Sequence, residues 1–181
     1  MPPAPVRPRL LVNGNAAPSL HRDLTSVRVH VAVGQATAQV ALAGPAEVGL
    51  FDLDDVVNTS LEIRLLQDEE FFAGWLTAVE TKSGADVRTV LYAEGSAPET
   101  ASSSPLPLSF GAEASGSVRR DADGWTAHCT CSQLALRMNS RIALTTQDPA
   151  FDGQLRVVEA WYTITAQEAS VEFLAVDDRS A

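Results

Sequence analysis

The chain is poor in cysteine and in positive charge. Its 181 residues include only two cysteines, so disulfides cannot supply its stability, while a 45% share of hydrophobic residues is enough for a packed core. It has 13 lysines and arginines against 23 acids, which gives a net charge of −10 at pH 7. This acidic surplus repels phosphate, so we expect no specific nucleic-acid binding.

Long apolar stretches are also absent. No window reaches the roughly 18 consecutive apolar residues that a membrane-spanning helix needs. The first residues, Met1 to Pro5, contain three prolines and lack the apolar core of a signal peptide. We therefore expect no membrane span and a protein that is made and kept in a cytoplasm.

Sequence motifs of catalysis and metal binding are missing as well. There is no nucleophile elbow, phosphate-binding loop, dinucleotide fingerprint or zinc-protease motif. Cys129 and Cys131 lie two apart, which places both thiols on one face of a strand, and we interpret them as buried or half-buried thiols. His21 and His30 lie about 100 residues upstream, so no metal-ligand spacing results. We predict no catalytic residues, no metal site, no cofactor and no enzymatic activity.

Alternation with a period of two dominates the pattern and predicts an all-β fold with one or two short helices. The short helix candidates are Ala46 to Val57 and Gln133 to Met138. The expected strands are Arg9 to Val12, Val27 to Val33, Thr37 to Leu42, Leu61 to Leu65, Phe72 to Glu80, Val87 to Ala93, Ser115 to Arg119, Gly124 to Cys131, Arg141 to Thr145, Gln154 to Thr165 and Ser170 to Ala175.

A stretch of small and polar residues with two prolines, Gly95 to Pro105, lies near the middle of the chain and has almost nothing that could pack. We interpret it as a linker between two domains. The expected organisation is a flexible N-terminus over 1–8, a first domain over 9–95, a linker over 96–106 and a second domain over 107–178.

The two halves share a pattern, which indicates an internal duplication. Both read Gln-Asp-x-x-Phe, then one or two residues, then Gly-x-Leu-x-x-Val-Glu. The matched positions are Gln67 and Gln147, Asp68 and Asp148, Phe71 and Phe151, Gly74 and Gly153, Leu76 and Leu155, Val79 and Val158, and Glu80 and Glu159.

Each shared block is typical of a β-hairpin whose second strand begins with a bend. The Gln-Asp pair makes the turn, the phenylalanine packs back over the hairpin, and the glycine sits where a side chain would collide. We therefore expect Gly74→Val and Gly153→Val each to damage its own domain. Trp75 and Trp161 lie on these second strands, and we expect both to pack in the core or between layers, with a stacking surface for a sugar or a base as the alternative.

The first half resembles the opening domain of the phage late-control protein D family, which comprises tail hub proteins. Four segments carry the likeness: Phe51 to Val57, Leu61 to Leu65, Phe71 to Glu80 and Leu91 to Ala93. The second half is similar to the second barrel of such a hub through Leu108 to Gly111, the strands around Arg119 and Trp125, Leu136 to Leu144 and Phe151 to Tyr162. The histidine usual near Trp161 is absent, and the chain is short for the family, so it resembles a minimal hub.

The resemblance implies two tandem small β-barrels, each similar to a subunit of a tail tube. Three chains would form a pseudo-sixfold homotrimer, whose partners would be the inner tube protein, a spike protein on a separate chain and baseplate wedge proteins. The chain would then join a hexameric tube to a trimeric spike in a phage tail or contractile injection system. The alternative is a small all-β module that binds a ligand or carbohydrate through exposed tryptophans.

Overall fold

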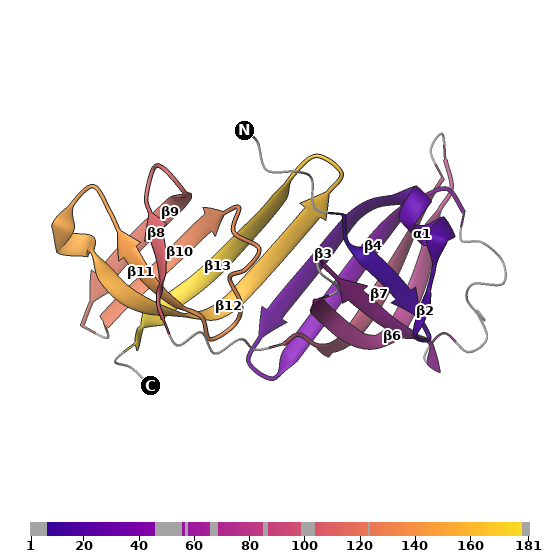
Figure 1. Ribbon diagram of the computed structural model, residues 1–181, viewed down its shortest axis with the longest axis horizontal. Helices are drawn as coiled ribbons and strands as arrows, with labels where there is room; N and C mark the ends of the chain where they lie inside the picture. Colours follow the sequence, from indigo (N-terminus) through magenta and orange to yellow (C-terminus); the bar gives the residue numbers. More distant parts are fainter. Residues whose placement is uncertain are drawn as a thin grey trace. The chain divides into compact units, whose positions relative to one another are not determined.

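A computed structural model describes residues 7–45, 56, 58–65, 69–84, 87–98, 104–122 and 124–178. Strands dominate the described residues, as the alternating pattern predicts, and the fold is all-β (Figure 1). The elements in chain order are β1 (Arg9–Val12), β2 (Asn15–Ala16), α1 (Pro18–Asp23), β3 (Leu24–Ala32), β4 (Gln35–Ala43), β5 (Ser60–Arg64), β6 (Glu70–Lys82), β7 (Arg88–Ser96), β8 (Leu106–Ser109), β9 (Ala114–Asp121), β10 (Gly124–Cys131), β11 (Arg141–Thr145), η3 (Pro149–Phe151), β12 (Gly153–Thr165) and β13 (Ala169–Asp177).

The chain divides into two compact units. Unit 1 takes Met1–His30, Gly34–Pro98 and Thr163–Ala169, and unit 2 takes Val31–Val33, Glu99–Tyr162 and Ser170–Ala181. Each unit has its own buried hydrophobic residues.

Unit 1 is a sheet in the order β2-β1-β5-β6-β7-β4-β3, drawn in indigo to magenta in Figure 1. The β1–β5, β5–β6, β6–β7 and β4–β7 pairs are antiparallel. The alternation of β3 places Val27 and Val29 on the buried face while Arg28 points outward. Leu10 from β1 and Leu91 from β7 are fully buried in the same unit. One apolar face per strand thus builds this core.

Unit 2 repeats this design around a different set of side chains. Its sheet runs β12-β13-β10-β9, with β11 on β12 and β8 on β11. Tyr162 and Phe173 are the largest buried side chains, and Cys129 shares their core. The Tyr162 hydroxyl donates a hydrogen bond to the Leu136 carbonyl oxygen at 2.8 Å, so the polar end of this buried ring is satisfied.

The segment expected as a helix over Gln133 to Met138 is instead a pair of turns. The Leu136 amide bonds to the Gln133 carbonyl oxygen, and the Ser140 amide bonds to that of Arg137. The buried Arg137 side chain donates to the Leu134 and Leu136 carbonyl oxygens. These bonds compete with helical ones, which is why the prediction is wrong. Of the other candidate, Ala46 to Val57, only residue 56 lies among the described residues.

The pattern missed four elements: α1, β2, β8 and η3. The helix α1 has six residues, no side-chain hydrogen bond at its first turn, and a proline near its start as its only signal. Strand β8 contains Pro107, a residue that argues against a strand, yet it pairs in parallel with β11. No helix among the described residues is long and apolar enough to cross a membrane.

Candidate functional site

The most distinctive feature of the chain is a five-stranded arrangement that occurs twice. Unit 1 contains the order β5-β6-β7-β4-β3, and unit 2 contains β11-β12-β13-β10-β9. The strands also follow each other in the same order along the chain in both units (Figure 1). The sixth strand differs, because β1 runs antiparallel to β5 whereas β8 runs parallel to β11. The duplicated pattern in the sequence thus accompanies a duplicated strand topology.

Two matched positions of the sequence repeat lie in similar surroundings in both units. Leu76 on β6 and Leu155 on β12 are each 1% exposed and belong to the two cores. Val79 and Val158 are half-buried. These pairs sit on the long second strand of each hairpin, as the repeat predicts.

The turn positions differ between the units. Phe71 is buried on β6, whereas Phe151 lies in η3 and is partly exposed, and its ring makes a T-shaped contact with that of Trp125 at a centroid distance of 5.8 Å. Asp148 caps η3 by accepting a hydrogen bond from the Ala150 amide at 3.0 Å. Gln147 is exposed, and Gln67 and Asp68 lie outside the described residues.

The two repeat glycines have different roles. Gly74 lies opposite Leu61 on β5 and Gly95 on β7, and a β-carbon there would overlap the Glu94 backbone. Gly153 begins β12 opposite Leu144 and has open space where a side chain would go. The expected steric conflict therefore holds for Gly74 and is wrong for Gly153, because the second hairpin lacks the close backbone approach.

Trp75 lies on the surface. Its side chain is 56% exposed, so the expectation that it packs in the core is wrong. It lines a hollow of about 320 Å³ whose other lining residues include Gly74, Gly95, Ser60 and Glu62. Ser60 on β5 lies directly opposite Trp75 on β6, so both side chains lie on the same face of the sheet.

The other two tryptophans are half-buried in unit 2. Trp161 on β12 has the ring of His128 at a centroid distance of 6.4 Å. Trp125 on β10 carries the guanidinium of Arg120 over its ring at 5.1 Å. Both indoles are thus held by neighbouring side chains.

Cys129 and Cys131 are free thiols on the buried face of β10, as their spacing predicts. Burial, with a small contribution from Cys131, raises the pKa of Cys129 to about 12. Burial also raises the pKa of Cys131. Both thiols therefore stay protonated near neutral pH, a state unsuited to nucleophilic attack. Nowhere in the described ranges do three His, Cys, Asp or Glu side chains gather as metal ligands.

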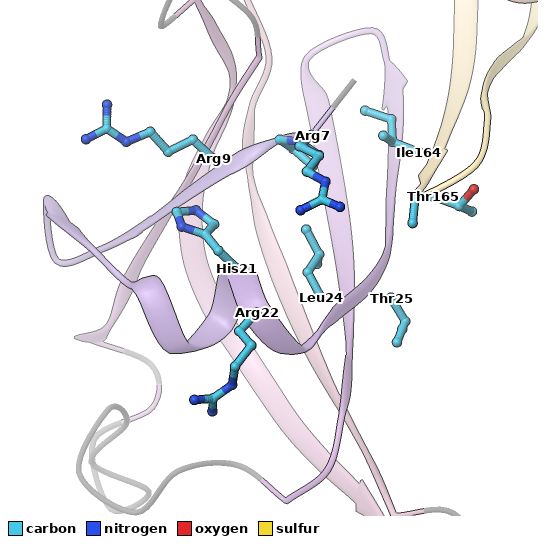
Figure 2. A pocket seen from close by; sticks show the side chains of 10 residues that line it. Arg7, Arg9, His21, Arg22, Leu24, Thr25, Ile164 and Thr165 are labelled. Carbon is cyan, nitrogen blue, oxygen red and sulfur yellow. The ribbon is translucent and has the colours of Figure 1, made fainter. Parts of the chain in front are cut away.

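A pocket of about 540 Å³ in unit 1 was not anticipated from the sequence (Figure 2). Arg7, Arg9, His21 and Arg22 line it, on β1, the residues before it and α1. The His21 Nε2 atom accepts a hydrogen bond from the Leu10 amide at 2.6 Å, so the ring is neutral in this arrangement. Partial burial, and then the charge of Arg9, lower the pKa of His21. The signal in the sequence is the Arg7-Pro8-Arg9 run, which leads into β1.

No protein-family model matches this sequence, and no curated protein matches it significantly. Solved structures do resemble it. A tail protein from Neisseria meningitidis MC58 matches with a TM-score of 0.71 and 7% identity, over 96% of this chain and 97% of that one. The 43 kDa tail protein of prophage MuSo2 from Shewanella oneidensis matches with a TM-score of 0.67 and 6% identity, over 96% and 97%.

A third solved structure is a component of the Escherichia coli type VI secretion system, described as similar to the T4 bacteriophage tail proteins gp27 and gp5. It matches with a TM-score of 0.62 and 8% identity, over 93% of this chain and 76% of that one. At such identities the likeness establishes the fold. The chain therefore has a fold that is found in phage tail and secretion-system proteins.

Proposed function

We propose that this chain is a structural hub of a phage tail or contractile injection system, a minimal member of the late-control protein D group. It joins a hexameric inner tube to a trimeric spike. The observation that carries the proposal is the strand order β5-β6-β7-β4-β3 and its copy β11-β12-β13-β10-β9, in a fold shared with tail proteins.

Duplication solves a symmetry problem at such a junction. A sixfold tube needs six similar docking surfaces, whereas a spike built from three chains needs three. Two similar β-barrels in each of three copies supply six similar faces, and the homotrimer keeps threefold symmetry for the spike. We assign one barrel to each unit of the chain.

The role is mechanical and not catalytic. The partners are the inner tube protein, a spike protein on a separate chain and baseplate wedge proteins. The chain folds in the bacterial cytoplasm and then becomes part of the particle. Its net charge of −10 suits the wall of a conduit, because like charge keeps phosphate or acidic cargo from adhering.

Affinity purification tests the partner set. The chain carries a tag in its native host, and mild purification is followed by mass spectrometry, with an untagged strain as control. We expect the tube protein and a separate spike protein in the tagged sample alone. Recovery of the chain by itself from particle-producing cells would contradict the hub role.

One observation favours a second candidate, a carbohydrate-binding module. Trp75 is 56% exposed and lines a hollow together with the polar residues Ser60, Glu62 and Ser96, an arrangement suited to stacking a sugar ring. A glycan array with the wild type and Trp75→Ser tests this role, with Trp125→Ser as the matched control. Binding lost only in Trp75→Ser would favour the module, and the absence of glycan binding would count against it.

A further inference from the structure

Each unit has a strand with an open backbone edge. Among the described strands of unit 2, β9 ends the sheet order and pairs only with β10, apart from a single bridge between Phe110 and Ala114. In unit 1, β6 pairs with β7 as far as Lys82 on one side, whereas its pairing with β5 on the other side stops at Trp75. The second half of β6, residues 77–82, therefore has no strand along that side within the part of the chain that the structure describes.

Both open edges lack the usual protection. Folded proteins blunt an edge with a proline, a charge or a very short strand, because unpaired backbone groups attract other chains. Two other outer strands of this fold follow that rule, since β2 has only two residues and β8 contains Pro107. Residues 115–118 of β9 and 77–79 of β6 contain neither proline nor charge. These two edges are therefore suited to pairing with another strand.

The duplicated strand order shows what a covered edge strand looks like in this fold. In that order β12 is the counterpart of β6, and β3 is the counterpart of β9. Ala160 on β12 is fully buried, whereas Thr81, at the matching position of β6, is exposed. Strand β3 buries Val27 and Val29, whereas residues 115–120 of β9 include no buried side chain. Since the units share their strand order, these exposed strands are where a further chain would add.

Strand β9 also lines a hollow of about 480 Å³. The apolar residues that line it are Phe110, Ala114, Val118 and Phe151. Neighbouring residues of a strand point to opposite faces, so one of Ala78 and Val79 would face this hollow if β6 of another copy lay along β9. Both side chains are small and apolar, which suits this lining.

We propose that β9 of one copy of this chain pairs with residues 77–82 of β6 in a second copy. The two open runs have similar lengths, and main-chain hydrogen bonds supply the affinity in such strand addition. The two edges differ, so the contact is head to tail, and each copy offers β9 to one neighbour and β6 to the other. A closed ring of three rests on the proposed hub function, whereas the edge pairing itself does not.

Proline substitutions in the full chain block an edge, because proline has no backbone N–H to donate. Neighbouring strand residues direct their N–H groups to opposite sides, so two adjacent positions are changed on each strand. The variants are Ser117→Pro and Val118→Pro on β9, and Glu80→Pro and Thr81→Pro on β6. In each pair, the variant that keeps the wild-type melting temperature blocks the open edge. The other loses a hydrogen bond inside its own unit and is the matched control.

Sedimentation velocity measures the assembly at about 0.15 M salt, where repulsion between these acidic chains is screened beyond about 8 Å. We expect the wild type to form a trimer at about 100 µM, and each edge-blocking variant to associate at least roughly tenfold more weakly. An equimolar mixture of a β9-blocked and a β6-blocked variant should form a 1:1 dimer and nothing larger. Only one intact pair of edges remains in that mixture.

Hydrogen exchange of the wild type tests the same contact without any substitution. Raising the protein concentration should slow the exchange of backbone amides in residues 115–120 and 77–82, because pairing removes their open N–H groups from water. Amides elsewhere on the surface should exchange at an unchanged rate. Protection that increases in other segments alone would place the contact on a different surface and overturn the proposal.

The sedimentation results can overturn it as well. A wild type that stays monomeric, a blocked variant that assembles like the wild type, or a mixture that gives no dimer would each contradict the pairing. Blocked variants that assemble normally but no longer co-purify the tube protein would make another protein the occupant of the edge.

Failure of the edge pairing and failure of the hub role are distinguishable. A chain that assembles through these edges but is absent from tail particles would refute the hub alone. Edge-blocked variants that enter tail particles in the normal copy number would refute the pairing alone.

Discussion

Gly74 on β6 lies directly opposite Gly95 on β7, and neither position has room for a β-carbon. A side chain at Gly74 would overlap the Glu94 carbonyl group, and one at Gly95 would overlap the Ala73 carbonyl oxygen. The pair lets the two strands approach closely just before the register shift between Leu76 and Ala78. Gly153 corresponds to Gly74 in the sequence repeat, but a β-carbon at Gly153 would meet no atom within 4 Å.

Gly74→Ala should therefore destabilise the chain, while Gly153→Ala should not. The first change forces backbone displacement, and we expect a loss of about 2 kcal/mol or more in the free energy of unfolding. The second should stay within about 0.5 kcal/mol of the wild type. Urea unfolding of the three proteins measures this. Equal stability of the two variants would contradict the account of the glycine pair.

Tyr162→Phe should cost about 1 kcal/mol of stability. The change removes the buried hydrogen bond from the Tyr162 hydroxyl to the Leu136 carbonyl oxygen. This oxygen still accepts a hydrogen bond from the Arg137 side chain at 3.3 Å, so it is not left without a donor. The matched control is Tyr92→Phe, whose hydroxyl bonds Glu80 at an exposed site at 2.9 Å. We expect less than about 0.5 kcal/mol for the control. Chemical denaturation distinguishes the two, and a larger loss in the control would be inconsistent with this structure.

His21 should make the chain less stable in mild acid. Its pKa is lowered from 6.5 in the folded state, so the unfolded chain takes up the proton more readily. Its contribution is fully present above pH 6.5 and is lost as the pH falls through the folded pKa. His21→Gln keeps an acceptor for the Leu10 amide without titrating.

Unfolding free energies at about pH 7.5 and about pH 5 measure this difference. The wild type should lose more stability between the two values than His21→Gln does. Other titrating groups act equally in both proteins and cancel in the comparison. An identical loss of unfolding free energy in the two proteins would show that protonation of His21 does not destabilise the folded chain.

The cysteines should resist modification until the chain unfolds. Both are buried, and their raised pKa values leave little thiolate at neutral pH. A thiol reagent that releases chromophore should react with the native protein at least roughly a hundredfold more slowly than with protein in denaturant. Fast reaction of both thiols in the native state would contradict their placement in the core of unit 2.

The strands were largely predictable because one-sided burial imposes a period of two. The expected spans Arg9 to Val12, Gly124 to Cys131 and Arg141 to Thr145 match β1, β10 and β11. The sequence pattern did not predict strand β8, because Pro107 argues against a strand. Parallel pairing with β11 stabilises the strand in spite of this proline, and sequence alone does not reveal that neighbour. Long-range strand pairing thus forms an element that the local sequence pattern could not predict.

The surface features were the least predictable. Trp75 looks like a core residue by its type, but the alternation of β6 turns it outward beside Gly74. The pocket arises because β1 and α1, which are separate in sequence, bring Arg9 and His21 together. Residue type indicates which side chains can be buried, and the register of the sheet determines which of them are buried.

The central claim is that three copies of this chain form the junction between tube and spike. Cryo-electron microscopy of tagged particles from the native host tests it most directly, because it shows both position and copy number. We predict three copies in one ring, with the two units of each copy making six similar contacts to the tube. One or six copies per ring, or no copy at the spike end, would contradict the account.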